Sequence, residues 1–272
     1  HSFLDFNLYI LSILLLAGMV VGRFHTLVFS APPIESFSFR PVQFVNRRGY
    51  RILTVLVGGS LFLYILAFGL ASFEYRRGSA LTMEAKWDVA YSAFERAQMY
   101  YPYADNIYTS RADLLRHMIS VLPESASNEK KAMFEEADRV LARAEELNPL
   151  RPQTFSARAV LYEKNPTLAG PEWVDTVIRN HRRAVELEPR AYQARFLYAD
   201  FLVKRGRREE AKRALEEGMK YVYVDNTHIA PYYALTAKLR ADAGDREGAT
   251  LLQRKIDVIK KTVPSQKGKL QL

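Results

Sequence analysis

The stretch ADRVLARAEELNP at residues 137–149 decides the fold of this chain, because the spacing of its small, bulky and proline residues is repeated elsewhere in the sequence. Its residues Ala137, Leu141, Ala144 and Pro149 follow one another at steps of four, three and five. Steps of three and four place side chains on one stripe of an α-helix, and a proline ends the helix. The same steps recur in Ala90, Phe94, Ala97 and Pro102, and in Val177, His181, Ala184 and Pro189.

A small residue precedes each of these sets on what we expect to be a partner helix. A small side chain lets the paired helix approach closely, and the bulky residue of the stripe then fills the space beside it. A fourth set, Ala211, Leu215 and Gly218, keeps the first two steps, and Ala249, Gln253 and Ile256 fit only loosely. The preceding small residues are Gly78, Ala112, Ala159, Ala199 and Ala237.

This pattern resembles the tetratricopeptide repeat (TPR), a helix–turn–helix unit of about 34 residues. Gly206 and Gly244 stand where that family has its inter-helix glycine. The stretches at 120–131 and 165–173 lengthen two units and are expected to be inter-helix loops. The alternative is a generic helical bundle. We expect about five units, beginning near Ala71, Asp105, Pro152, Tyr192 and Ala230.

A stack of such units has a concave face lined by the first helix of each pair, and that face is the candidate partner-binding surface. Polar, amide-bearing side chains on it are suited to holding a peptide backbone or another protein surface. For any one of them taken alone, an ordinary solvated helix face is the preferred interpretation. The candidate residues are Asn106, Thr109, Asp113, Gln153, Ser156, Glu163, Gln193, Phe196, Asp200 and Lys204.

Two charge-free apolar runs precede the repeats, at residues 6–22 and 52–73. Their lengths approach or match the roughly 20 residues that a helix needs to cross a bilayer. A buried core helix seldom continues so far without a charge, and the first run lacks the basic leader of a signal peptide. The sequence therefore predicts transmembrane helices within residues 1–23 and 52–73.

The segment between the runs, residues 24–51, is rich in arginine and contains one acidic residue, Glu35. Short basic loops stay in the cytoplasm. Residues 74–272 are then expected on the other side, which is the periplasm if the source is a Gram-negative bacterium. The predicted fold class is all-α: two transmembrane helices followed by a TPR-like α-solenoid of about five helix pairs.

Composition excludes several kinds of chemistry. The chain of 272 residues has no cysteine, which excludes disulfides, thiol catalysis and thiolate zinc sites. The net charge of +9 suggests nucleic acid, but the positive residues alternate with acidic ones and no nucleic-acid-binding motif accompanies them. The five histidines have no metal-ligand spacing, and Gly58-Gly59 is followed by no phosphate-loop lysine. We therefore expect no catalytic group, cofactor, metal or nucleic-acid partner in this chain.

Tyr100, Tyr101, Tyr103 and Tyr108 cluster where the first unit meets the second. Such a cluster could stack on a sugar, but packing between repeats is the simpler explanation.

The amino terminus carries a second resemblance. Its HSFLDFNL stretch is similar to a His-Ser-x-x-Asp-Phe-x-Leu stretch that opens a late transmembrane helix in O-antigen ligase/polymerase-like membrane proteins. The matched residues are His1, Ser2, Asp5, Phe6 and Leu8. That family implies a glycosyltransferase with many spans acting on a lipid-linked glycan, with its catalytic arginine and histidine in an upstream periplasmic loop. Nothing in this chain matches that loop, and residues 11–13 depart from a Pro-Ala-containing stretch common in the family.

Two functions fit these features, and the first is preferred for this chain. In the first, the chain is a membrane-anchored TPR scaffold or accessory subunit in a bacterial inner membrane. Its partners would be the bilayer and the membrane and periplasmic proteins of a larger complex. In the second, it is the carboxy-terminal portion of a ligase or polymerase whose catalytic spans lie outside this chain, working with lipid-linked glycan machinery.

Overall fold

A computed structural model describes residues 47–223 and 228–262 of the chain, and every regular element in these ranges is a helix. The predicted first span and most of the predicted basic loop lie outside the described residues. The chain divides after Leu61 into two compact units, and the second unit contains the whole of the repeat array.

Helix α2, Arg47–Met83, contains the predicted span 52–73 within a longer helix. Its first turn is formed by residues that we expected at the end of the basic loop. A segment of α2, Val55–Met83, is the one described helix that is long and apolar enough to cross a membrane, as judged by length and composition. Whether it does so remains a prediction.

The remaining helices confirm the repeat boundaries. Helices α4, α6, α8 and α10 begin at Asp105, Pro152, Tyr192 and Ala230, four of the five predicted starts, whereas the fifth, Ala71, lies inside α2. Helices α3, α5 and α7 each end two residues before a proline of the repeated pattern. The bounds are α3 Trp87–Tyr100, α4 Asp105–Val121, α5 Ser127–Leu147, α6 Pro152–Lys164, α7 Trp173–Leu187, α8 Tyr192–Lys204, α9 Arg208–Gly218, α10 Ala230–Asp242 and α11 Arg246–Thr262.

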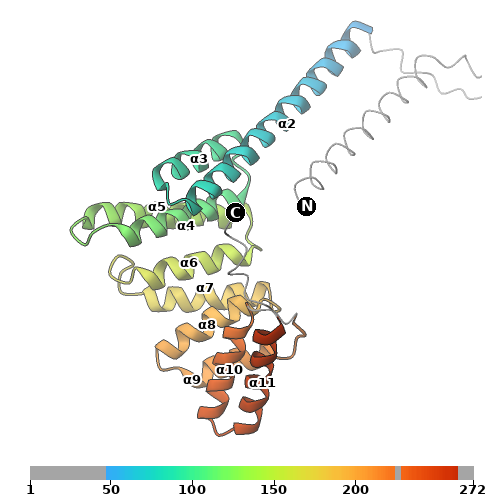
Figure 1. The fold of residues 1–272 in the computed structure, drawn as a ribbon. Coiled ribbons are helices and arrows are strands. Elements are labelled where there is room, and N and C mark those ends of the chain that lie inside the picture. Colours follow the sequence, from blue (N-terminus) through green and yellow to red (C-terminus); the bar gives the residue numbers. More distant parts are fainter. Residues whose placement is uncertain (1–46, 224–227, 263–272) are drawn as a thin grey trace, which may run out of the picture. The chain divides into compact units, whose positions relative to one another are not determined.

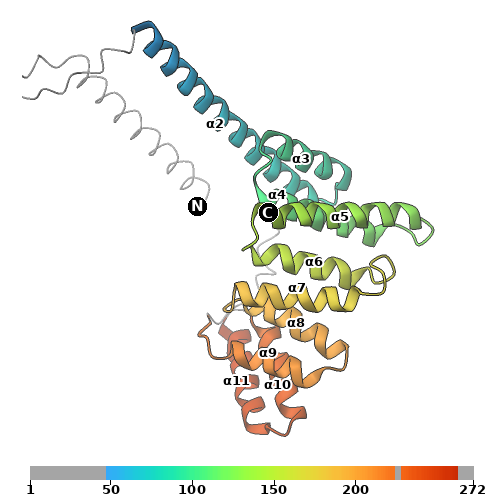
Figure 2. The ribbon, with the colours of Figure 1, turned by 180° about the vertical axis from the view of Figure 1, so that it is seen from behind.

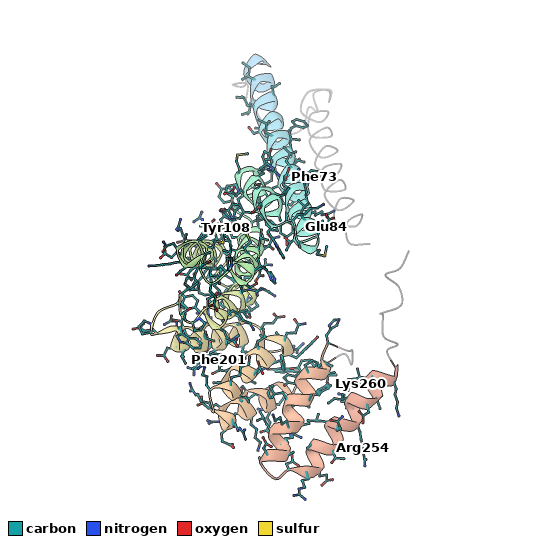
Figure 3. The ribbon with its side chains drawn as sticks, turned by 60° about the vertical axis from the view of Figure 1, so that its left-hand side comes forward. Phe73, Glu84, Tyr108, Phe201, Arg254 and Lys260 are labelled. Atoms are coloured by element: carbon teal, nitrogen blue, oxygen red, sulfur yellow. The ribbon has the colours of Figure 1, made fainter. Side chains whose placement is uncertain are left out.

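The helices stack in chain order, as Figures 1 and 2 show from opposite sides. Each helix from α3 onward contacts the next, and the first helices α4 and α6, and α8 and α10, also contact each other. Side chains fill the space between helices, with Tyr108 of α4 and Phe201 of α8 labelled in Figure 3. The described chain is therefore an array of helix pairs, as the repeat predicted.

The packing rule inferred from the spacing holds in the first pair. A Cβ added to Gly78 of α2 would lie 3.0 Å from the ring of Phe94 of α3. The bulky residue of the stripe thus occupies the space that the glycine leaves. Ala112, Ala159 and Ala199, at the equivalent place in later units, are all buried.

The two inter-helix glycines also serve the predicted purpose. Gly206 and Gly244 have φ angles of +75° and +88°, a left-handed conformation that glycine adopts without steric cost. Each follows the first helix of its pair and starts the turn into the second helix. In the first case Arg207 N–H donates a hydrogen bond to Leu202 O at 2.9 Å, as in a Schellman motif.

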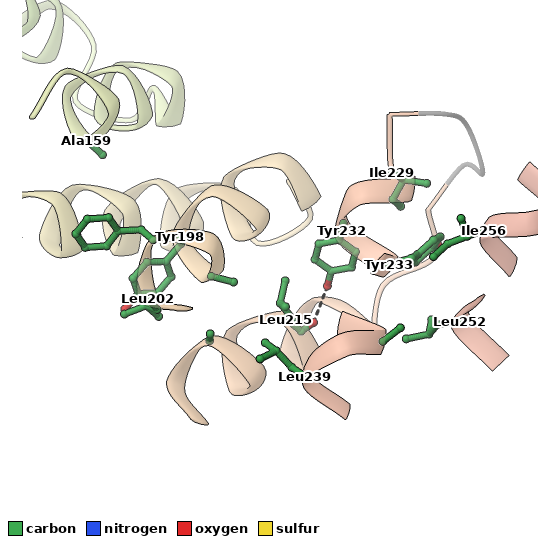
Figure 4. Close-up of a cluster of buried hydrophobic side chains, with 14 of the residues drawn as sticks. Ala159, Tyr198, Leu202, Leu215, Ile229, Tyr232, Tyr233, Leu239, Leu252 and Ile256 are labelled. Carbon is green, nitrogen blue, oxygen red and sulfur yellow. Dashed lines mark hydrogen bonds between the residues drawn. The ribbon is translucent and has the colours of Figure 1, made fainter. Parts of the chain in front are cut away.

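The largest hydrophobic core joins the last three pairs, from α6 to α11 (Figure 4). Tyr232 and Tyr233 of α10 are fully buried in it, and Tyr232 Oη donates a hydrogen bond to Leu215 O of α9. Core residues therefore hold neighbouring units together as well as the two helices of one pair. This continuity is typical of repeat arrays, in which no single unit buries its apolar face alone.

Two details of the prediction were wrong. Residues 120–131 are mostly helical, because α4 continues to Val121 and α5 starts at Ser127, which leaves a loop of residues 122–126. The insertion lengthens the helices because its second half is rich in Glu and Lys, which favour helix. In α11 the buried stripe is Leu252, Ile256 and Ile259, whereas Gln253 is exposed. The insertion at 165–173 does form the expected loop, between α6 and α7.

Candidate protein-binding groove

Three first helices, α4, α6 and α8, line a groove that contains half of the predicted binding residues. Its cavity volume is about 280 Å³. The predicted residues in its lining are Thr109, Asp113, Gln153, Ser156 and Gln193. The other lining residues are Arg116, Pro152, Ala157, Val160, Glu188, Ala191, Ala194 and Leu197.

Two glutamines occupy equivalent positions in the groove. Gln153 and Gln193 are each the second residue of their helix, in α6 and α8, and both are exposed. A carboxamide offers two N–H donors and one carbonyl acceptor, which are the groups that complement a peptide backbone. The repeat therefore presents the same backbone-binding group twice, one unit apart.

The floor between these amides is made of small and medium apolar residues. Ala157 and Val160 come from α6, and Ala194 and Leu197 come from α8. Small side chains leave room for the main chain of a ligand, and their apolar surface gains from being covered. The groove thus combines a polar edge with an apolar floor.

The charged residues give the groove a slight negative character. Asp113 of α4 pairs with Arg116 at 3.4 Å, and Glu188 adds a second carboxylate to the lining. Burial raises the pKa of the Asp113 carboxyl above its ordinary value, against the opposing effect of Arg116. A cationic group on a ligand would favour the ionised form of Asp113, so the groove is suited to a basic side chain.

Thr109 has a structural role within the lining. Its hydroxyl donates to Asp105 O at 3.1 Å and lies 3.4 Å from the hydroxyl of Thr154 on α6. Because both hydroxyls are buried, this contact links α4 to α6 and leaves little for a ligand.

The other five predicted residues lie outside this groove. Lys204 of α8 pairs with Glu163 of α6 at 3.0 Å and with Asp200 at 2.7 Å. These bonds, first of all the one to Asp200, raise the pKa of Lys204. Phe196 packs against the core that joins α6 to α11, and Asn106 is partly buried near the start of α4. The ion-pair group thus connects two units, and Phe196 stabilises the array.

Sequence reasoning missed Arg116, Val160 and Leu197, although a regular spacing marks them. Each lies seven or four residues after a predicted residue, on the stripe that continues Thr109, Gln153 or Gln193 along its helix. Taking positions i, i+4 and i+7 of each first helix would have found them. The prediction favoured polar residues and therefore left out the apolar floor.

A larger hollow of about 980 Å³ lies elsewhere, among α5, α6 and α7. Five of its nine charged lining residues pair with one another. Arg158 contacts Asp138 at 3.0 Å and Glu145 at 2.6 Å, and Arg183 contacts Glu186 at 3.5 Å. Paired charges have less to offer a ligand, so we take the smaller groove as the candidate site.

Helix pairs stacked in chain order, with glycine turns and small residues between the helices, define a helical-repeat protein of the TPR type. No family model and no curated protein matches the chain. The crystal structure of MamA is similar at 13% identity and a TM-score of 0.47, covering 75% of this chain and 96% of that one. TTC0263, a TPR protein of Thermus thermophilus, is similar at 15% identity and a TM-score of 0.49, covering 70% and 92%.

YrrB, described as a TPR protein with an unusual peptide-binding site, is similar at 18% identity and a TM-score of 0.41, covering 69% of this chain and 85% of that one. Similarity at this level concerns the fold alone. It gives no support to the resemblance to O-antigen ligases, which stays a prediction.

Proposed function

We propose that this chain is a membrane-anchored scaffold whose helical array holds a partner protein by an extended segment in the groove of α4, α6 and α8. The observation that carries the proposal is the pair of equivalent, exposed amides of Gln153 and Gln193 above an apolar floor. An extended peptide has backbone groups for these amides and side chains for the floor. The charge of the groove favours a segment with at least one basic residue.

Anchoring is supported by α2. The most apolar window of this helix is only 6% buried, whereas the core helix of a soluble protein would be mostly covered. Moving the exposed leucine, valine and phenylalanine side chains of α2 from water into lipid lowers their free energy. We propose that α2 crosses a bacterial inner membrane. We also propose that the array lies in the periplasm, because the arginine-rich segment 24–51 precedes the apolar run of α2.

The groove is tested by selecting peptides from a random library on the 272-residue chain and measuring their affinity for variants. Changing both Gln153→Ala and Gln193→Ala should weaken binding about ten- to thirty-fold, since each lost hydrogen bond costs about 1 kcal/mol. A control with Glu135→Ala and Glu209→Ala, exposed positions on the second helices α5 and α9, should bind as the parent does. Equal affinity of the two double variants would exclude the groove as the binding surface.

The orientation is tested with a reporter enzyme that works only in the cytoplasm, fused after Leu272. We expect it to be silent in a Gram-negative host, because the basic segment 24–51 should stay in the cytoplasm and the array should then lie on the other side of the membrane. A matching fusion after Arg51 should be active. Strong activity of the first fusion would place the array in the cytoplasm.

The ligase-like alternative concerns a longer parent protein. It rests on His1, Ser2, Asp5, Phe6 and Leu8, which lie outside the described residues. A species much heavier than 31.2 kDa, isolated from its native membrane, would favour it over a separate scaffold subunit.

A further inference from the structure

The turn between α3 and α4 carries an aromatic cluster that packs on α2. The ring of Tyr101 lies edge-on to Phe68 at 5.4 Å and to Tyr64 at 6.0 Å. The hydroxyls of Tyr64 and Tyr101 are 3.2 Å apart, and the ring of Tyr103 meets that of Tyr101 at 5.9 Å. The turn is thus level with a segment of α2 that we propose to lie in the membrane.

Packing between repeats does not account for the whole cluster. Tyr108 does serve the repeats, since it belongs to the partly buried shell of the core of α4 and α5. Tyr103, in contrast, is 68% exposed, and Met99 at the end of α3 is 69% exposed. On α2 itself Phe62 is 65% exposed and Leu66 is 46% exposed. An exposed apolar surface of this kind points to a partner.

The length of α2 identifies that partner. A helix needs about 20 residues to cross the hydrocarbon layer, so a span that starts at Ile52 continues to about Ala71, some two turns beyond Tyr64. A turn that contacts Tyr64 and Phe68 therefore cannot lie in bulk water if α2 crosses the bilayer. It has to enter the outer part of the same membrane.

The chemistry of the turn is suited to that depth. Residues 99–104 carry no charge, and neither do residues 52–73 of α2, where Phe73 closes the run (Figure 3). Tyrosine gathers at membrane interfaces because its ring is apolar and its hydroxyl remains hydrated.

Part of the backbone of the turn is also satisfied from within. Tyr101 N–H donates to Ala97 O at 3.0 Å. Pro102 has no N–H, and its carbonyl accepts a bond of 3.1 Å from Tyr108 Oη. Internal pairing of this kind is what an apolar layer demands of a backbone.

We propose that the α3–α4 turn is a second membrane-binding element, with Tyr101 and Tyr103 where the outer acyl chains of the bilayer that α2 crosses meet the headgroups. This inference rests on the proposed anchoring by α2. The ligand is the lipid interface itself: an apolar layer for the rings and hydrated headgroups for the hydroxyls. Contact at α2 and at the turn would hold the first repeat against the membrane surface.

The test uses the 272-residue chain with Trp87→Phe and Trp173→Phe, so that one introduced tryptophan reports alone. Tyr103→Trp places the reporter in the turn, and Val222→Trp places the control at a fully exposed position of the last units. Each variant is reconstituted in phosphatidylcholine vesicles with or without bromine on the acyl chains near the headgroups. Bromine should reduce the Tyr103→Trp emission roughly twofold or more, because an interfacial ring lies beside it, and should leave the Val222→Trp emission unchanged.

Flotation of the vesicles separates the possible failures. If the chain floats but the Tyr103→Trp emission is the same with and without bromine, the turn lies in water and the inference is wrong, while anchoring stands. If the chain does not float, anchoring and the inference fail together. Equal quenching of both reporters would show unspecific adsorption. If bromine does not quench the Tyr103→Trp emission in vesicles but residue 103 cross-links to a protein in native membranes, the surface binds a protein partner. Either outcome overturns the proposal.

Discussion

Acidification from pH 7 to pH 5 should destabilise the array by about 2 kcal/mol through His181 alone, approaching 3 kcal/mol at pH 4. His181 of α7 is 0% exposed, and neither ring nitrogen has a hydrogen-bond partner among the described residues. Burial, with a smaller contribution from Lys204, lowers its pKa to about 4. The unfolded chain takes up a proton near the ordinary pKa of 6.5, and the folded chain does not. Stability is therefore complete above pH 6.5 and is lost as the pH falls towards 4.

The matched variant is His181→Leu, because Leu141 and Leu215 occupy the same place in the neighbouring units. It should fold, and it should lose the part of the pH dependence that belongs to the imidazole. Urea unfolding of parent and variant, followed by helix signal at pH 7, 6 and 5, measures the difference. The gap between the two chains should widen as the pH falls. A constant gap would mean that His181 is hydrated or protonated in the folded state.

The helix boundaries could be predicted because the packing of paired helices limits the sequence at fixed places. A glycine or alanine at the closest approach, such as Gly78 beside Phe94, cannot be exchanged freely for a larger residue. Proline and left-handed glycine mark the ends of helices by their backbone geometry alone. Signals of this kind are local, so they survive in a single sequence.

The parts that were missed depend on contacts between units. The insertion at 120–131 has helix-forming residues, and only its packing against the next helix decides where α4 ends and α5 begins. The stripe of α11 runs through Leu252, Ile256 and Ile259 because these side chains join the core that links α6 to α11, a contact that the local spacing does not report.

For the groove, the sequence predicted which helix face binds a partner, but it did not predict which residues of that face line the cavity. Gln153 and Gln193 follow from their position in each first helix. The pairing of Lys204 with Glu163, by contrast, joins residues from different units whose distance no local pattern reports. The apolar floor was missed because the surface that binds the ligand was expected to consist almost entirely of polar residues.

Replacing Gly218 by alanine should destabilise the array by about 2–4 kcal/mol, although helix propensity alone predicts a gain of about 1 kcal/mol. Gly218 is the last residue of α9, and a Cβ there would lie 2.3 Å from Tyr232 Oη and 2.6 Å from Arg195 Cδ. Both side chains are buried and hydrogen-bonded. Arg195 donates to Pro189 O at 2.9 Å and to Ala214 O at 3.0 Å, and Tyr232 donates to Leu215 O at 2.5 Å. Making room for one methyl group therefore disturbs bonds from α8 and α10 at once.

Gly248→Ala in α11 is the matched control. Its Cβ would also be crowded, at 2.3 Å from Asp245 Oδ2 and 2.8 Å from Arg240 Nη1, but these atoms are the ends of flexible and partly exposed side chains. Arg240 can turn away at little cost, whereas moving Asp245 weakens the bond of 2.8 Å that Gly248 N–H donates to its Oδ1, so Gly248→Ala should cost no more than about 1 kcal/mol. Thermal and urea unfolding of both variants against the parent measure the contrast. Equal stability of the two alanine variants would show that Tyr232 and Arg195 can move as freely as a surface side chain. The stated order would show that bonds between units, rather than helix propensity, determine how firmly the last pairs are held to the array.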